Sequence, residues 1–72
     1  MVFKIDSLMR ERGITTQVRL AELTGIHPTR IGPLVRGTVR RIDVETVERL
    51  CRGLNCQPGD IMVYEPDPDE GR

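Results

Sequence analysis

Four arginines lie between positions 30 and 41 with no acidic residue among them: Arg30, Arg36, Arg40 and Arg41. A guanidinium group presents a planar fork of N–H donors. This fork pairs with phosphate oxygens and can bind the O6 and N7 acceptors of guanine in a bidentate manner. Such a cluster indicates a polyanionic partner. The alternative is an ordinary solvated surface on which charges of both signs alternate.

The distribution of charge favours the first interpretation, although the formal net charge of the 72-residue chain is zero. Residues 65–72 carry four acidic side chains and one arginine, whereas the rest of the chain holds ten Lys or Arg and seven Asp or Glu. We therefore expect a basic domain over residues 1–64. The segment 65–72 is acidic, rich in Pro and almost free of apolar side chains, so it is predicted to be a disordered tail.

Other reactive side chains are few. Two cysteines and one histidine, Cys51, Cys56 and His27, are too few ligands for a structural zinc site. A disulfide is disfavoured in a reducing compartment, so Cys51 is interpreted as a small core residue and Cys56 as part of a turn. The sequence shows no nucleophile–base pair and no phosphate-binding glycine loop. We therefore expect no enzyme activity, no cofactor and no bound metal.

The sequence has no apolar run long enough to span a membrane, and no signal peptide. A cytoplasmic protein without a membrane partner is therefore expected.

Helices are expected to position the arginines, because aromatic residues are scarce and Leu, Ile and Val must fill a small core. Asp6-Ser7 is predicted to cap a first helix that ends at Gly13, although a start one turn earlier, near Lys4, also fits. A second helix begins at Thr15 or Thr16 and ends at Gly25. Its predicted buried side comprises Val18, Leu20, Ala21 and Leu23.

A third helix is predicted over Pro28–Arg36, because Pro is favourable at the first helical position and Gly37 can terminate the helix in the left-handed conformation. Residues 38–42 form a basic loop. Asp43 then caps a fourth helix, for which Asn55 is the expected terminator. The apolar stripe of this helix is Val44, Val47, Leu50, Cys51 and Leu54.

The ends of the domain are predicted to meet. Pro58 opens a short fifth helix through Ile61 and Met62, and Val63-Tyr64 follows as a short edge strand. This strand could pair with residues 2–4 of the same chain. The same edge, with the apolar N-terminus, could instead join two copies of the chain.

The second and third helices are joined by a turn of only a few residues, so they must cross closely. Such a crossing requires a small side chain on the first helix, here Ala21, and a residue that accepts positive φ in the turn, here Gly25. Apolar side chains must then hold the two helices together. Those predicted to do so are Leu20, Ile26, Ile31 and Leu34.

The spacing from Leu20-Ala21 through Gly25-Ile26 to Ile31 and Leu34 resembles, without a gap, the helix-turn-helix of the Cro and phage-repressor family. The later segment from Ile42 to Ile61 resembles the closing helices of a compact subgroup of that family. Together the resemblance covers nearly all of residues 3–64. It implies an all-α, five-helix, lambda-repressor-like fold, to which a short pair of strands from the two ends can be added.

The resemblance also implies a regulator of transcription, expected to be a repressor, that binds double-stranded DNA. A homodimer is expected because one small module buries only about 600–1,000 Å² on DNA. In the family the second helix of the motif enters the major groove, and its N-terminal residues reach the bases. Carried over, the groove-facing residues are His27, Pro28, Thr29, Arg30, Gly32 and Pro33. The residues implied to contact phosphates are Thr16, Gln17, Arg36, Thr38, Arg40 and Arg41.

This sequence departs from the family pattern at Gly32-Pro33. An interior Pro removes one backbone hydrogen bond and clashes with the carbonyl of Thr29, so the third helix is predicted to be kinked, or broken and restarted at Pro33. Neither residue can donate a hydrogen bond from its side chain to a base. Among the remaining candidates only Arg30 could bind guanine in a bidentate manner.

A second function therefore stays open at this point. The chain could be an antitoxin or an accessory subunit that uses the motif partly to contact another protein. The basic loop favours DNA, whereas Gly32-Pro33 favours the protein partner. One extra residue between Gly13 and the motif also leaves the start of the second helix uncertain.

Overall fold

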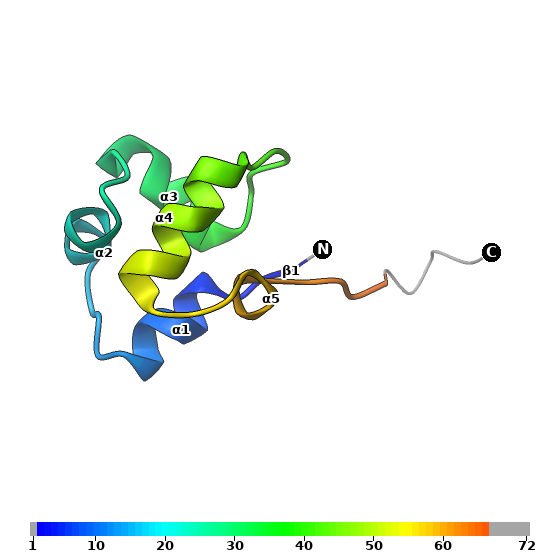
Figure 1. Cartoon of the computed structure of the whole chain (residues 1–72), viewed down its shortest axis with the longest axis horizontal. Coiled ribbons are helices and arrows are strands. Elements are labelled where there is room, and N and C mark those ends of the chain that lie inside the picture. Colours follow the sequence, from blue (N-terminus) through cyan, green and yellow to red (C-terminus); the bar gives the residue numbers. More distant parts are fainter. Residues whose placement is uncertain (1, 67–72) are drawn as a thin grey trace.

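Five helices and one short antiparallel sheet make up the described part of the chain, residues 2–66 of a computed structural model. In chain order they are β1 (Val2–Phe3), α1 (Ile5–Glu11), α2 (Gln17–Thr24), α3 (Pro28–Arg36), α4 (Val44–Leu54), α5 (Pro58–Ile61) and β2 (Met62–Val63). α2 and α3 occupy one end of the molecule, α4 runs through the middle, and α1 and α5 lie at the other end (Figure 1). The predicted five-helix architecture with a terminal strand pair is confirmed.

The two strands join the ends of the described chain. Their antiparallel register pairs Val2 with Val63 and Phe3 with Met62. Next to them, the Lys4 amide donates a hydrogen bond to the Ile61 carbonyl at 2.7 Å. The strand starts one residue earlier than the predicted Val63-Tyr64, because α5 ends at Ile61, whose side chain is fully buried. The predicted tail residues 67–72 lie outside the described part of the chain.

The start of α1 differs from the cap predicted at Asp6-Ser7. The helix begins at Ile5 with Lys4 as its N-cap residue, so the alternative start is correct. The Leu8 amide donates to the Lys4 carbonyl at 3.0 Å, which closes the first turn. Pairing of β1 with β2 places Lys4 directly before the helix. Its position is therefore set by tertiary contacts and not by a polar capping side chain.

The ends of α2, α3 and α4 lie where local rules predict them, although Asp43 at the N-cap of α4 makes no side-chain cap hydrogen bond. α5 ends at Ile61, one residue before the predicted Met62. Thr16 Oγ1 accepts a hydrogen bond from the Arg19 amide at 3.1 Å and caps α2. Left-handed residues terminate the next three helices: Gly25 with φ 72°, Gly37 with φ 71° and Asn55 with φ 53°. These residues relieve the unsatisfied carbonyls at each helix end. No helix within residues 2–66 is long and apolar enough to cross a membrane.

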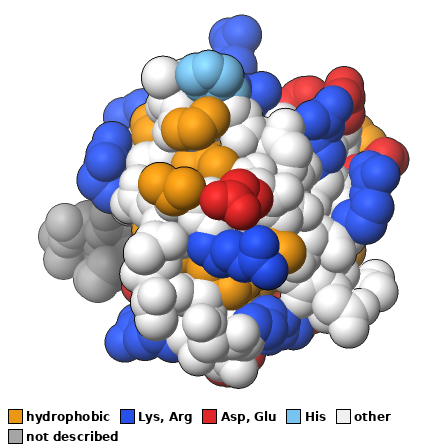
Figure 2. Space-filling model, turned by 90° about the vertical axis from the view of Figure 1, so that its left-hand side faces the viewer, with side chains coloured by type: hydrophobic (Ala, Val, Ile, Leu, Met, Phe, Trp, Pro, Cys, Tyr) orange, Lys and Arg blue, Asp and Glu red, His pale blue; other side chains and the backbone are white. Residues whose placement is uncertain are grey.

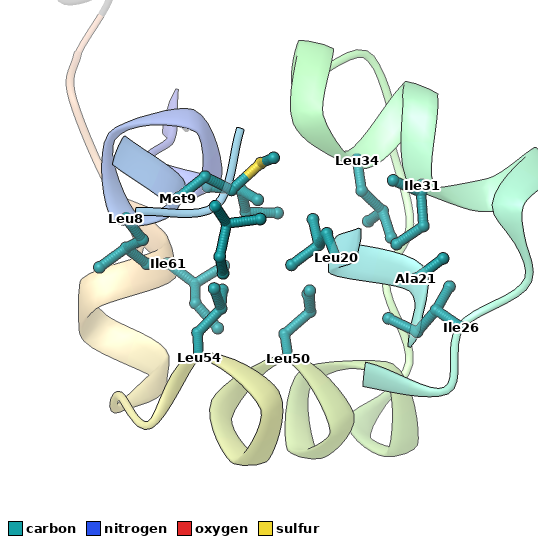
Figure 3. Close-up of a cluster of buried hydrophobic side chains, with 12 residues drawn as sticks. Leu8, Met9, Leu20, Ala21, Ile26, Ile31, Leu34, Leu50, Leu54 and Ile61 are labelled. Carbon is teal, nitrogen blue, oxygen red and sulfur yellow. The ribbon is translucent and has the colours of Figure 1, made fainter. Parts of the chain in front are cut away.

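Aliphatic side chains from all five helices converge in one core (Figure 3). The largest fully buried side chains are Ile5, Leu20, Ile31, Leu50, Leu54 and Ile61. The apolar residues predicted to hold the second and third helices together are also buried, namely Leu20, Ala21, Ile26, Ile31 and Leu34. Fully burying one Leu or Ile side chain is worth about 1.5–3 kcal/mol, so this cluster supplies the main stabilisation of so small a domain.

Three residues predicted to be buried are exposed: Val18 by 63%, Leu23 by 38% and Val44 by 73%. In α2 the buried face is narrower than predicted and ends at Thr24. The Thr24 hydroxyl can be buried because it donates to the Leu20 carbonyl at 2.8 Å. In α4 the buried residue of the first turn is likewise a threonine. The prediction was wrong because it ranked residues by hydrophobicity alone, whereas a threonine whose hydroxyl is hydrogen-bonded can also be buried.

The contact between α2 and α4 is close at Gly53. A Cβ atom added to this glycine would lie 2.7 Å from Thr24 Cγ2 and 2.9 Å from the Leu23 carbonyl oxygen. The second of these atoms belongs to the backbone and cannot rotate away. Gly53 is therefore needed for the approach of the two helices, a role that the sequence analysis did not assign.

We predict that Gly53→Ala lowers the free energy of unfolding by about 1–3 kcal/mol, the usual range for overpacking. The loss should exceed the gain of up to about 1 kcal/mol that Ala brings to a helix relative to Gly. Urea denaturation followed by circular dichroism measures the change. Gly59→Ala in α5 is the matched control, because a Cβ there meets nothing within 4 Å. An equal effect at both positions would contradict the close approach.

Candidate nucleic-acid interface

The turn between α2 and α3 is held from two sides. Thr24 Oγ1 accepts a hydrogen bond from the Ile26 amide at 3.3 Å inside the turn. From α4, Arg49 Nη1 donates to the Gly25 carbonyl at 2.8 Å, while its Nη2 lies 2.7 Å from Glu45 Oε1. α4 is therefore bonded directly to the residue at which the chain changes direction. The orientation of α3 relative to α2 follows from these contacts.

The first turn of α3 is exposed and carries its own cap. His27 is the N-cap residue, and its Nδ1 accepts a hydrogen bond from the Thr29 amide at 3.2 Å. The same nitrogen lies 2.8 Å from Thr29 Oγ1. Pro28 occupies the first helical position, where a missing N–H costs nothing. All three side chains point to solvent at the start of a helix whose direction is fixed.

α3 continues through Gly32-Pro33 to Arg36, so the predicted break and restart at Pro33 is wrong. The end of the helix is well bonded: the Thr38 amide donates to the Pro33 carbonyl at 3.0 Å and the Gly37 amide to the Leu34 carbonyl at 3.2 Å. These bonds hold the segment after Pro33 in place, although Pro33 itself lacks an N–H donor.

The structure places Gly32 and Pro33 differently from the exposed first turn. Pro33 is half-buried and Gly32 is buried. What covers Gly32 is the side chain of Arg36, whose Nη1 would lie 3.0 Å from a Cβ atom at position 32. Gly32 therefore has no side chain of its own to present, and Arg36 occupies the surface above it.

Arg30, the residue predicted to bind guanine, is directed to the start of α4. Its Nη2 donates to Thr46 Oγ1 at 3.1 Å and lies 3.6 Å from Asp43 Oδ1. The buried Thr46 hydroxyl in turn donates to Asp43. This hydrogen bond, with the positive charge of Arg30, holds the pKa of the Asp43 carboxyl below its ordinary value of 3.8. Arg30 thus links α3 to α4.

The residues predicted to contact phosphates surround α3. Thr16 and Gln17 are exposed at the N-terminus of α2, where the helix dipole favours an anion. Thr38 follows α3, and its hydroxyl lies 3.5 Å from the Pro33 carbonyl. Arg40 and Arg41 are exposed in the loop that leads to α4. These donors therefore lie in two segments, the N-terminus of α2 and the loop that follows α3.

The molecular surface over α2 shows how these charges are distributed (Figure 2). Most Lys and Arg side chains lie around the margin of this face, whereas hydrophobic side chains lie near its centre together with one acidic group and a basic side chain beside it. This side of the molecule is therefore no uniform basic patch. Charge alone would therefore not determine how a polyanion is oriented on this face.

The two cysteines and the histidine do not combine into a second site. Cys51 and Cys56 are free thiols, both half-buried against the core. Burial, with the neighbouring Cys51, raises the pKa of the Cys56 thiol. Within residues 2–66 no group of three or more His, Cys, Asp or Glu side chains is arranged to hold a metal ion.

Sequence reasoning missed three residues that position α3: Asp43 and Thr46 as partners of Arg30, and Arg49 as the partner of the Gly25 carbonyl. A local signal existed for the first pair, because an Asp at an N-cap followed three residues later by Thr is a capping pattern. No local signal existed for Arg49, whose partner lies 24 positions away in the chain.

Comparisons with known proteins agree with this geometry. A family model described as a Cro/C1-type HTH DNA-binding domain matches residues 4–67. The chain is also 34% identical over 71 residues to a Bacillus subtilis (strain 168) protein named as an uncharacterized HTH-type transcriptional regulator, YozG. That alignment covers 99% of this chain and 83% of the relative. No solved structure gives a significant match.

The lowered pKa of Asp43 predicts how its contribution to stability depends on pH. Because the folded pKa lies below 3.8, the carboxylate stabilises the folded state, and this contribution is complete above about pH 5. It is lost as the pH falls through 3.8 toward the folded pKa. The difference in unfolding free energy between the natural chain and Asp43→Asn should therefore shrink over this range. Urea denaturation at a series of pH values measures it.

Thr46→Val provides the control for this prediction, because it removes the hydroxyl that donates to Asp43 but keeps the side-chain volume. In the Thr46→Val background, replacing Asp43 by Asn should produce a weaker dependence on pH. A difference between the natural chain and Asp43→Asn that is the same at every pH would contradict the assignment.

Proposed function

We infer that this chain, which belongs to the Cro/C1-type helix-turn-helix DNA-binding family and is a DNA-binding regulator of transcription, acts as a repressor. In this proposal α3 enters the major groove of duplex DNA. The observation that carries the proposal is the exposed first turn of α3, held in place by the bond between Arg49 and the Gly25 carbonyl. In this family geometry the N-terminal residues of the second motif helix reach the bases.

The groove-facing surface in this proposal begins with His27, Pro28 and Thr29. His27 Nδ1 accepts from the Thr29 amide, which leaves Nε2 as the ring nitrogen available to DNA. Pro33 borders the groove one turn further on, where it can make only apolar contacts. Gly32 contributes the backbone beneath Arg36, and Arg30 supports the helix from the side of α4.

Phosphate contacts are proposed for the segments on either side of α3. The N-terminus of α2 offers Gln17 and the hydroxyl of Thr16, whose oxygen already accepts the Arg19 amide and leaves the O–H free to donate. Beyond α3, the loop offers Thr38, Arg40 and Arg41. Such contacts fix the position of the protein on DNA without reading its sequence.

Repression and a cytoplasmic location are proposed on the same basis. A domain docked in the major groove of promoter DNA occupies surface that RNA polymerase would otherwise cover. The relative is a bacterial protein, and in a bacterium chromosomal DNA and newly made proteins share the cytoplasm.

Affinity for duplex DNA should depend steeply on salt. If about four phosphates are contacted, the logarithm of the affinity should fall with the logarithm of salt concentration with a slope near −3.6. Fluorescence-anisotropy titrations of a labelled duplex at several salt concentrations measure the slope. Replacing Arg40 and Arg41 by Ala should reduce its magnitude by about 1.8 and weaken binding to all sequences alike.

Arg52→Ala is the control for this experiment, since Arg52 lies in the last turn of α4 and is not part of either proposed contact set. It should leave the slope close to that of the natural chain. Binding that does not respond to salt, or an equal effect of the control, would contradict the proposed phosphate contacts.

We further propose that the protein binds DNA as a homodimer. A single module of this kind buries about 600–1,000 Å² on DNA, which is little for tight and selective binding. β1 and β2 pair within the chain, and each has one neighbour in the two-stranded sheet. Pairing of an outer strand edge with the same edge of a second copy would extend this sheet across the dimer axis.

Sedimentation velocity with a two-fold symmetric duplex tests the stoichiometry. We expect two chains per duplex, and one chain on a duplex that carries half of the symmetric site. A single chain on the symmetric duplex at saturation would rule out the dimer.

A further inference from the structure

Gly32 is buried in α3, and the nearest atoms that a Cβ there would meet belong to a single side chain. An ideal Cβ atom at position 32 would lie 3.0 Å from Arg36 Nη1, 3.6 Å from Cζ and 3.6 Å from Nη2. These three nearest atoms all belong to the guanidinium group. The planar head of Arg36 therefore lies over the backbone of α3, one helical turn before its own position.

The geometry of an α-helix explains this arrangement. Side chains in a helix lean toward its N-terminus and cover the turn that precedes them, so Arg36 covers position 32. Any residue with a Cβ would hold the guanidinium further from the helix axis. Gly32 thus provides a seat in which the guanidinium lies close to α3.

The seat lies on the face of α3 that begins with Thr29. Positions three and four apart are neighbours on a helix, which places Thr29, Gly32, Pro33 and Arg36 on one continuous surface. Gly32 and Pro33 leave this surface without side-chain donors, and Arg36 supplies five N–H donors directly above the first of them. Arg36 itself is exposed, and among residues 2–66 it forms no ion pair.

Arg30, the other arginine of α3, is placed differently. Its guanidinium bonds to Thr46 and faces Asp43, so it is held toward α4. A bidentate contact to a base requires both edges of the fork to be available in the groove. Arg36 meets this requirement within α3 and Arg30 does not.

We propose that Arg36, seated over Gly32, is the specificity-determining residue of this protein and binds the O6 and N7 atoms of a guanine in the major groove. The proposal rests on the proposed docking of α3 in duplex DNA and assigns to Arg36 a base in place of the phosphate that the sequence predicted. It also gives Gly32 a function. Because Gly32 has no side chain, the guanidinium of Arg36 can lie over it and take the place of a base-contacting side chain at position 32.

The test uses the full chain and a library of duplexes with a randomised central region, from which the natural protein selects its preferred sequence. Arg36→Lys keeps the positive charge but loses the bidentate fork. Discrimination in favour of guanine at one position of each half-site should fall by roughly ten- to a hundredfold. Arg52→Lys, at an arginine outside both proposed contact sets, is the matched control, and it should leave the selected sequence unchanged.

Gly32→Ala separates this function from a structural one. The added Cβ meets only the end of a flexible side chain, so the protein should fold, and its melting temperature should rise because Ala favours a helix over Gly. At the same time the displaced guanidinium should lose its preference for guanine at the same position as in Arg36→Lys. A more stable variant with a weaker base preference is the expected result.

Four outcomes would overturn the proposal. Arg36→Lys or Gly32→Ala could leave the selected sequence unchanged, which would place Arg36 outside base recognition. Arg36→Ala could weaken binding to all duplexes equally, which would make Arg36 a phosphate contact. The natural protein could bind duplex DNA in a salt-dependent way without any base preference, which would refute this proposal and leave the proposed function standing. If it bound no duplex at any salt concentration, both would fall.

Discussion

The direction in which α3 leaves the molecule depends on how closely α2 can approach α4. Gly53 permits contact with the backbone of Leu23, and a buried Thr24 fills the space beside it without an unpaired hydroxyl. One turn earlier in α4, Arg49 reaches the carbonyl of Gly25. Because the chain changes direction at that glycine, a shift of α4 would reorient α3 as a whole. The orientation of the surface proposed to face DNA thus depends on the contact between α2 and α4.

α3 remains continuous in spite of Gly32-Pro33, a pair that disfavours a helix by about 4 kcal/mol relative to two alanines. Its ends are strongly defined by the imidazole cap of His27 and the left-handed Gly37. Between them, Ile31 and Leu34 are buried in the core (Figure 3). Tertiary packing therefore holds a helix whose own residues would not form it in isolation, in agreement with the general weakness of short helices in water.

The arginines of this protein fall into two groups. Some bond to other parts of the chain, and others are exposed to solvent. Arg30 and Arg49 bond to α4 or to the turn before α3, so they stabilise the orientation of the motif. Arg40 and Arg41 lie exposed in a loop. Counting arginines along the sequence does not distinguish these roles, because Thr46 lies 16 positions from Arg30 and Gly25 lies 24 positions from Arg49.

The sequence by itself determined the helix-turn-helix spacing, the ends of α2, α3 and α4, and the small side chain at the crossing. These features follow from φ, capping and periodicity, which act within about one turn of helix. Only the tertiary structure decided that Val18 and Val44 are exposed, that Lys4 precedes α1, and that Arg30 bonds to α4. Such outcomes depend on which segments meet in space. The partner of a side chain then depends on which residues of other segments lie next to it in the folded chain, and capping and periodicity do not describe this.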